Sequence, residues 1–201
     1  MEADMTYDYT FQIDHIDYGV VKGGGRIVLI KTGLGSDYFG YENKYLTMAF
    51  QLRNQYGFSV LVASNPHDGR RHTRMDQQAL EQCTAALCGG SPELYFFGHS
   101  NGGIKGLELT STGISFKKMV LVNMPLMINF HKTKRYILAI PQTTILAIFG
   151  EQDPSVSYAP FLERAAENVR VLTIPQADHT FRGMTNEFIG LSEWLMERKM
   201  Q

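Results

Sequence analysis

A glycine-rich serine turn has the clearest chemical potential of any feature in this sequence. Residues 98–102 read Gly-His-Ser-Asn-Gly and fit the pattern G-x-S-x-G. The turn follows the apolar run 93–97 (ELYFF) and precedes a predicted helix that begins near Gly102. A strand–turn–helix of this kind strains the serine backbone and lifts its Oγ out of the sheet. We therefore expect Ser100 to be a nucleophile at a helix N-terminus, where the helix dipole favours developing negative charge.

Two further residues have the chemistry and the position to activate Ser100. A serine hydroxyl is a weak nucleophile at neutral pH and needs a base, together with a group that orients the base. Asp153 comes just after the apolar run 144–149, and His179 follows the run 169–174. The carboxyl ends of parallel strands meet at the sheet edge where α/β proteins place their ligand sites. The sequence therefore predicts a Ser100–His179–Asp153 triad.

Other acids and histidines compete for these two roles. Glu151 lies nearer to the strand end than Asp153. Asp178 is adjacent to His179, and sequence neighbours seldom orient each other's rings well. His99 lies inside the serine turn, where we expect it to shape the floor of a pocket. The remaining histidines have no comparable place at a strand end: they are His15, His67, His72 and His131.

The elements that must position these residues alternate along the chain. Apolar runs predict strands at 26–31, 59–63, 93–97, 118–122, 144–149 and 169–174, after an N-terminal strand or hairpin within 9–21. Helical spacing predicts helices at 43–56, 75–87, from about 102, 158–168 and 186–199. Segment 123–142 looks irregular, although 126–130 and 136–140 could form short helices. Such alternation is typical of an α/β fold with a mostly parallel sheet.

The order of elements, the turn at 98–102, and the later acid and histidine resemble the α/β-hydrolase superfamily. The likeness extends from about Arg26 to the C-terminus. It implies one domain over 1–201, with a mostly parallel central sheet flanked by helices on both faces and a Ser–acid–His triad in that chain order. Family members often carry a cap domain before the strand that precedes the acid. Only segment 123–142 is available for it here, so we expect a minimal cap.

The resemblance also implies an oxyanion hole made of two backbone N–H groups. One belongs to Asn101, the residue after the nucleophile, and the other to the loop after 26–31. In that loop Leu34, flanked by glycines, is the best candidate. Thr32 stands where family members often have a histidine. The second donor is therefore Leu34 or one of the residues next to it.

Three residues are candidates for contact with substrate. His99 belongs to the serine turn, and Met124 begins an apolar stretch that could form a pocket wall or pack against the sheet. Arg70 lies in the most basic loop of the chain, 67–74. Its guanidinium could pair with a substrate carboxylate or phosphate if the loop reaches the site, although such loops are usually solvated.

Composition and charge restrict the class of protein. The 201 residues are 44% hydrophobic, and 19 basic side chains balance 20 acidic ones to a formal net charge of −1. This balance gives no reason to expect a nucleic acid or a membrane as partner. There is no secretory pattern and no apolar run near the ~20 residues that span a bilayer, so we expect a cytoplasmic protein. Cys83 and Cys88, roughly 140° apart on a predicted helix, are expected to be reduced thiols.

The sequence thus predicts a serine hydrolase that cleaves a small-molecule ester or thioester through an acyl-enzyme, with no cofactor and no metal. An alternative is a hydrolase-fold protein that has lost catalysis and serves as a binding or interaction protein. The intact triad argues against this alternative, and the unusual oxyanion loop argues for it. A metal-dependent hydrolase that uses His67, His72 and Asp68 is a weaker hypothesis, because no third well-spaced ligand is evident. The residues indicate no oligomeric state.

Overall fold

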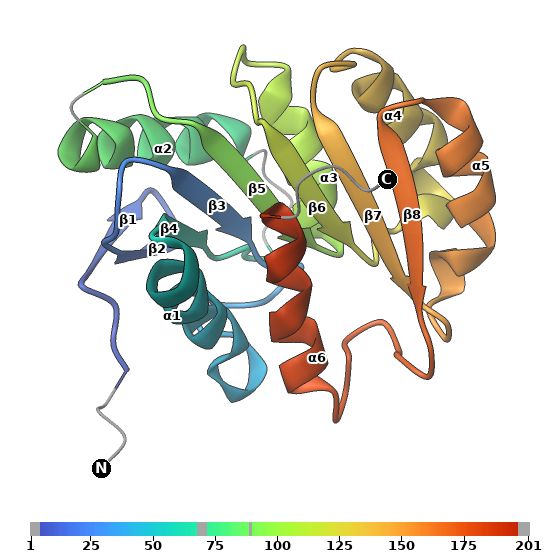
Figure 1. Ribbon diagram of the computed structural model, residues 1–201, viewed down its shortest axis with the longest axis horizontal. Helices are drawn as coiled ribbons and strands as arrows, with labels where there is room; N and C mark the ends of the chain where they lie inside the picture. The colour runs from blue at the N-terminus through green and yellow to red at the C-terminus, as the bar shows by residue number, and fades with distance from the viewer. Residues whose placement is uncertain (1–4, 68–71, 89, 197–201) are drawn as a thin grey trace.

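A mixed, mostly parallel sheet of eight strands forms the centre of the molecule (Figure 1). The computed structural model describes residues 5–67, 72–88 and 90–196. The strand order is β1-β2-β4-β3-β5-β6-β7-β8. The strands are β1 (Tyr9–Ile13), β2 (Ile16–Val21), β3 (Ile27–Lys31), β4 (Ser59–Ala63), β5 (Leu94–His99), β6 (Lys118–Val122), β7 (Thr144–Gly150) and β8 (Val169–Ile174).

The direction of the strands follows from their place in the sheet. Strands β4, β3, β5, β6, β7 and β8 run parallel, whereas β1 and β2 form an antiparallel hairpin and β2 pairs antiparallel with β4. The expected N-terminal hairpin is therefore confirmed. The inner strands β3, β4 and β6 are buried at every residue, because helices cover both faces of a parallel sheet.

The helices form two layers, and alternate residues of the inner strands face each layer. Helices α1 (Lys44–Tyr56) and α6 (Thr185–Gly190) contribute to the core on one face. The opposite face is covered by α2 (Thr73–Leu87), α3 (Asn101–Thr110), α4 (Leu126–Leu138) and α5 (Ala159–Ala165). Short 3-10 turns η1 (Tyr41–Asn43), η2 (Pro154–Tyr158) and η3 (Leu191–Leu195) precede α1, precede α5 and follow α6.

Two regions differ from the sequence-based expectation. Segment 123–142 is not irregular but contains one helix, α4, because the parallel crossover from β6 to β7 needs an element that covers the sheet. The predicted C-terminal helix changes to the 3-10 turn η3 after Gly190, a poor helix former. Its expected end at 197–199 lies outside the described residues.

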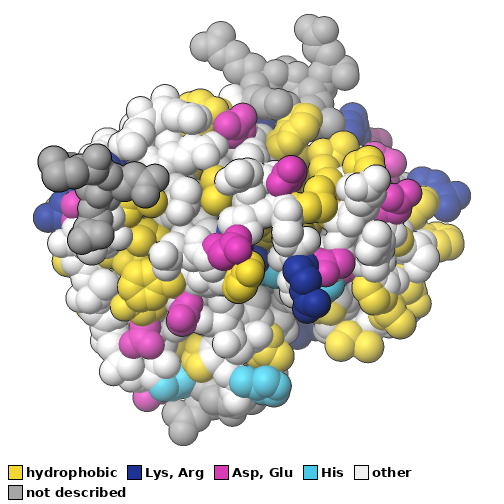
Figure 2. Space-filling model, turned by 90° about the horizontal axis from the view of Figure 1, so that it is seen from below, with side chains coloured by type: hydrophobic (Ala, Val, Ile, Leu, Met, Phe, Trp, Pro, Cys, Tyr) yellow, Lys and Arg dark blue, Asp and Glu magenta, His cyan; other side chains and the backbone are white. Residues whose placement is uncertain are grey.

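The carboxyl ends of the parallel strands gather at the lower edge of the sheet in Figure 1, and Figure 2 looks onto the molecule from that side. Hydrophobic side chains and charged side chains of both signs are interspersed on this face. Across the described ranges, no helix combines the length and apolar character needed to cross a bilayer. Cys83 and Cys88 are free thiols, as expected.

Candidate active site

Ser100 occupies a sharp turn between the end of β5 and the first residue of α3. Its backbone has φ 54° and ψ −126°, a strained conformation for a residue other than glycine. The glycines on either side permit the turn. A Cβ at Gly102 would lie 2.3 Å from the carbonyl oxygen of Lys31, and one at Gly98 would lie 2.7 Å from Cα of Gly103. A side chain at either position would therefore collide with backbone atoms of the turn or of the neighbouring strand.

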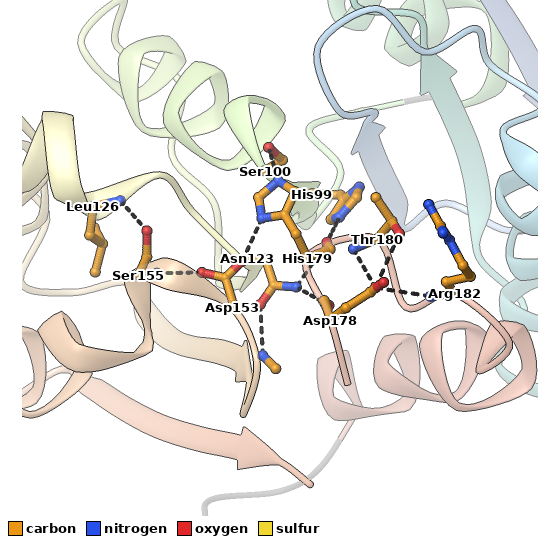
Figure 3. A network of polar contacts seen from close by, with 11 residues as sticks. His99, Ser100, Asn123, Leu126, Asp153, Ser155, Asp178, His179, Thr180 and Arg182 are labelled. Carbon is orange, nitrogen blue, oxygen red and sulfur yellow. Dashed lines mark hydrogen bonds and ion pairs between the residues drawn. The ribbon is translucent and has the colours of Figure 1, made fainter. Parts of the chain in front are cut away.

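Ser100, His179 and Asp153 form a continuous hydrogen-bonded chain (Figure 3). Oγ of Ser100 lies 2.9 Å from Nε2 of His179, and Nδ1 of His179 bonds with Oδ2 of Asp153. A carboxylate can only accept, so Nδ1 carries the proton and Nε2 presents its lone pair to the serine hydroxyl. The Asp153 side chain is fully buried, whereas the His179 side chain is 40% exposed.

The segment after β7 holds Asp153 in place. Oδ1 of Asp153 accepts a hydrogen bond from the backbone N–H of Ser155 at 2.7 Å and so caps η2, which begins with Pro154. Oγ of Ser155 accepts one in turn from the N–H of Leu126, the first residue of α4. Both carboxylate oxygens are thus engaged, and this fixes the plane in which Asp153 meets His179.

His99 connects two loops beneath the serine. Its Nε2 lies 3.0 Å from the carbonyl oxygen of His179, and its Nδ1 lies 3.1 Å from the hydroxyl of Tyr45. Burial, together with the nearby charge of Lys44, lowers the pKa of His99 to about 3, so the ring is neutral. The Tyr45 hydroxyl also accepts from the N–H of Gly33 at 3.4 Å.

Asn123, which the sequence analysis did not single out, braces the same loop. Its Nδ2 donates to the carbonyl oxygens of His179 at 2.9 Å and Asp178 at 3.1 Å, and its Oδ1 accepts from the N–H of Gly150 at 2.7 Å. It is fully buried, with φ at 47°. A polar residue directly after β6, at the edge where the triad residues gather, was the signal available in the sequence.

The rival acids hold the backbone of the histidine loop. Oδ1 of Asp178 accepts from the N–H groups of Arg182 and Thr180, and these bonds, with that from Arg182 the largest cause, lower the pKa of Asp178. Oε2 of Glu151 accepts from the N–H of Gln176 at 2.9 Å. Both carboxylates therefore support the loop that carries His179.

A cavity of about 430 Å³ opens beside Ser100 and His179. Four segments line it: the loop after β3, the start of α1, the serine turn and the histidine loop. The lining residues are Gly33, Leu34, Ser36, Tyr41, Lys44, Tyr45, His99, Ser100, His179, Thr180 and Arg182.

Of the two expected oxyanion donors, Leu34 lines the cavity, whereas Asn101 follows Ser100 and is not among the lining residues. Asn101 is the first residue of α3, where an N–H has no acceptor within the helix. The N–H groups of Gly33 and Gly35 bond with Tyr45 and Asn65, and no described residue accepts from the N–H of Leu34 between them.

The expected substrate contacts are only partly found in the cavity. His99 lines it, but Met124 does not. Met124 is fully buried beneath the turn, where a Cβ at Gly103 would come within 2.8 Å of its Cγ. Arg70 lies outside the described residues. The cations that line the cavity are instead Lys44 and Arg182.

Among the residues with described positions, no group of three His, Cys, Asp or Glu side chains could hold a metal ion. Asp68 of the hypothetical His67–His72 site lies outside the described residues. His72 itself is buried, 5.3 Å from the His15 ring between centroids.

Comparison with known proteins finds similar structures at low sequence identity. No family model and no curated protein matches the chain. Est1E from Butyrivibrio proteoclasticus has a TM-score of 0.74 at 13% identity, covering 94% of this chain and 97% of its own. Another structure of that protein has ferulic acid bound. Dienelactone hydrolase from Anabaena variabilis has a TM-score of 0.69 at 20% identity, covering 94% and 96%. A lidless α/β serine hydrolase from Xanthomonas campestris has a TM-score of 0.65 at 18% identity, covering 96% and 98%.

Proposed function

We propose that this chain, which has the fold of the small lidless α/β hydrolases, is a serine hydrolase that cleaves a carboxylic ester or thioester. The observation that carries the proposal is the unbroken hydrogen-bonded chain from Ser100 through His179 to Asp153, beside an open cavity. The fold alone does not determine the reaction, whereas these side chains have the chemistry that ester cleavage needs.

In the first half of the reaction, Oγ of Ser100 attacks the acyl carbon while Nε2 of His179 takes the hydroxyl proton. Asp153 keeps the ring oriented and stabilises its charged form. The N–H groups of Asn101 and Leu34 bind the oxyanion of the tetrahedral intermediate. His179 then gives its proton to the departing alcohol or thiol, and the acyl group remains on Ser100.

In the second half, a water molecule replaces the leaving group. His179, 40% exposed, takes a proton from this water, and the oxygen attacks the acyl carbon. The same two N–H groups bind the second oxyanion, and Ser100 recovers its proton as the carboxylic acid leaves. Apart from the substrate and this water, the two half-reactions use only groups of the chain itself.

The proposal is tested with a fluorophosphonate probe, which reacts with activated serines, and intact mass as the readout. The wild type is expected to gain one adduct at Ser100, and Ser100→Ala and His179→Ala are expected to gain none. Ser111→Ala, a change of an exposed serine at the end of α3, is the matched control and should label fully. A folded wild type that stays unlabelled across a range of pH would favour a binding protein with a hydrolase fold.

A further inference from the structure

A buried lysine lines the cavity of the candidate active site. Lys44 is the first residue of α1 and is 7% exposed. Its Nζ lies 4.1 Å from the centroid of the Phe188 ring and 3.4 Å from the carbonyl oxygen of Thr180. None of the ion pairs between described residues includes Lys44. Buried charges in proteins are normally paired, so this ammonium group lacks its usual counter-charge.

The surroundings of Lys44 disfavour a positive charge. Burial lowers the pKa of the Lys44 ammonium to about 8, although the carboxylate of Asp178 opposes part of this shift. That carboxylate is occupied by N–H groups of its own loop. A cation at the N-terminus of a helix also faces the positive end of the helix dipole. The Phe188 ring and the Thr180 carbonyl oxygen therefore stabilise the ammonium group only in part, and no described carboxylate pairs with it directly.

The backbone just before Lys44, at the edge of the cavity, is strained. Glu42 and Asn43 have φ of 53° and 55°, in the left-handed region that residues other than glycine rarely adopt. The carboxylate of Glu42 accepts a hydrogen bond from Oγ1 of Thr185, which ties this turn to the start of α6. Strain that surrounding structure maintains is characteristic of functional sites.

A second cation, Arg182, lines the same cavity. Arg182 belongs to the histidine loop, and Figure 3 shows it beyond Thr180, on the side away from Asp153. The Asp178 carboxylate holds the backbone of this residue through its N–H. Two positively charged side chains from distant parts of the chain thus meet at one cavity, next to Ser100.

We propose that Lys44, together with Arg182 on the same cavity, binds a carboxylate of the substrate, so that the protein selects esters or thioesters that carry a free carboxylate besides the bond to be cleaved. This inference rests on the proposed function. An ammonium group has three donors, and the contact with Thr180 uses one of them. A substrate carboxylate would supply the missing counter-charge, and its single negative charge matches a single buried ammonium.

The test compares pairs of substrates that differ only in charge. Monomethyl esters of succinic, glutaric and adipic acid are each paired with the monoester whose free carboxylate is replaced by a carboxamide. The acid released at pH 7 gives kcat and KM. The wild type should favour at least one carboxylate over its carboxamide by roughly tenfold or more, mainly through KM, because charge-assisted hydrogen bonds are the stronger ones.

Three variants assign this preference to Lys44. Lys44→Met should lose it while still cleaving the carboxamide esters, and Lys44→Arg should retain most of it. Lys134→Met, which removes the same charge from an exposed position on α4, should leave the preference unchanged. Circular dichroism checks that each variant folds. Should Lys44→Met fail to fold, the wild-type ratio decides, and a ratio near one overturns the inference.

Two further readouts separate this inference from the proposed function. Fluorophosphonate labelling of Ser100, without any selectivity for the carboxylate esters, would overturn carboxylate binding and leave the serine hydrolase standing. Absence of labelling in a folded wild type would instead contradict the proposed serine-hydrolase function. Calorimetry of glutarate binding to Ser100→Ala, with and without Lys44→Met, tests the carboxylate site without catalysis. We expect roughly tenfold weaker binding in the double variant, and equal affinities would overturn the inference.

Discussion

The carbonyl oxygen of His179 accepts a hydrogen bond from Nε2 of His99, 3.0 Å away. A carbonyl can only accept, so Nε2 of His99 carries the proton and Nδ1 must accept from the hydroxyl of Tyr45. The residue before the proposed nucleophile thus holds the backbone of the proposed base. Through Tyr45 and Gly33, the same ring is connected to the loop that contains Leu34.

Tyr45→Phe should weaken this connection. Removal of the hydroxyl leaves Nδ1 of His99 without a donor in a fully buried position. The free energy of unfolding should fall by about 1–3 kcal/mol, as expected when a buried polar group loses its partner. Fluorophosphonate labelling of Ser100 should also become slower, because His179 is held less firmly. Urea denaturation and the time course of labelling measure the two effects.

Tyr95→Phe is the matched control for that change. The Tyr95 hydroxyl donates to Glu93 at 3.1 Å, at the opposite end of β5 from Ser100. We expect a loss of about 0.5 kcal/mol or less and no change in labelling. Equal effects of the two substitutions would contradict a special role for the Tyr45 hydroxyl.

The stability of the protein should depend on pH through His99. Its pKa falls from the ordinary value of 6.5 to about 3 in the folded chain, so between these values the unfolded chain binds more protons. The free energy of unfolding should therefore decrease as pH falls from 6.5 toward 3, by up to about 1.4 kcal/mol per pH unit from this residue. Urea denaturation of the wild type and His99→Gln at several pH values isolates the contribution.

His99→Gln should show a shallower pH dependence than the wild type over that range. His131→Gln, which replaces an exposed histidine on α4, should follow the wild-type curve. If the free energy of unfolding depended on pH equally in wild type and His99→Gln, protonation of His99 would not destabilise the folded chain.

Substitution of Asn123 should impair the proposed base, His179, although the His179 side chain itself is unchanged. Both Asn123→Ala and Asn123→Gly remove the amide that holds the His179 carbonyl, and labelling of Ser100 should slow roughly tenfold to hundredfold, as for other small misplacements of reacting groups. Alanine also has to adopt a φ of 47°, so Asn123→Ala should be about 1–2 kcal/mol less stable than Asn123→Gly. Normal labelling of Asn123→Gly would show that the amide is dispensable.

Gly102→Ala should damage the turn that carries Ser100. The added Cβ would lie 2.3 Å from the carbonyl oxygen of Lys31, a backbone atom that cannot move aside easily. We expect a loss of about 1–3 kcal/mol or more in thermal denaturation, together with slower labelling. Gly25→Ala, where an added Cβ meets nothing within 4 Å, should be close to neutral. A neutral effect of Gly102→Ala would mean that the backbone around the turn can shift enough to accommodate the added Cβ.

Much of the fold could be predicted because buried parallel strands are easy to recognise. Runs such as those of β3 and β6 are apolar and buried at almost every residue, and the serine turn follows one of them. The α/β-hydrolase fold expected from that pattern is confirmed by the similar structures. Helix α4 was predicted only as short helical stretches, because apolar residues also occupy its exposed side. Met127 is 56% and Ile128 84% exposed, and this obscures the helical period.

The walls of the cavity were harder to predict than the strand ends. Ser100, Asp153 and His179 could be related to one another because a parallel sheet brings strand ends together, although their catalytic roles remain a prediction. No comparable rule predicts that Lys44, at the start of a helix, lies at the same site. Its contacts with Thr180 and Phe188 join segments far apart in the chain, and in sequence it reads as the start of an amphipathic helix. The density of basic residues in 67–74 suggested Arg70 instead, but the sequence of that loop does not say whether it reaches the site.

The cavity takes its reactive groups and its walls from different kinds of element. Strand ends and their buried braces hold the hydrogen-bonded chain, whereas the loop after β3 and the residues after His179 form much of the enclosure. Changes of specificity and changes of reactivity would therefore arise at separate positions. A lineage of such proteins could exchange one substrate for another by drift in the enclosing loops, while selection kept the braced residues constant.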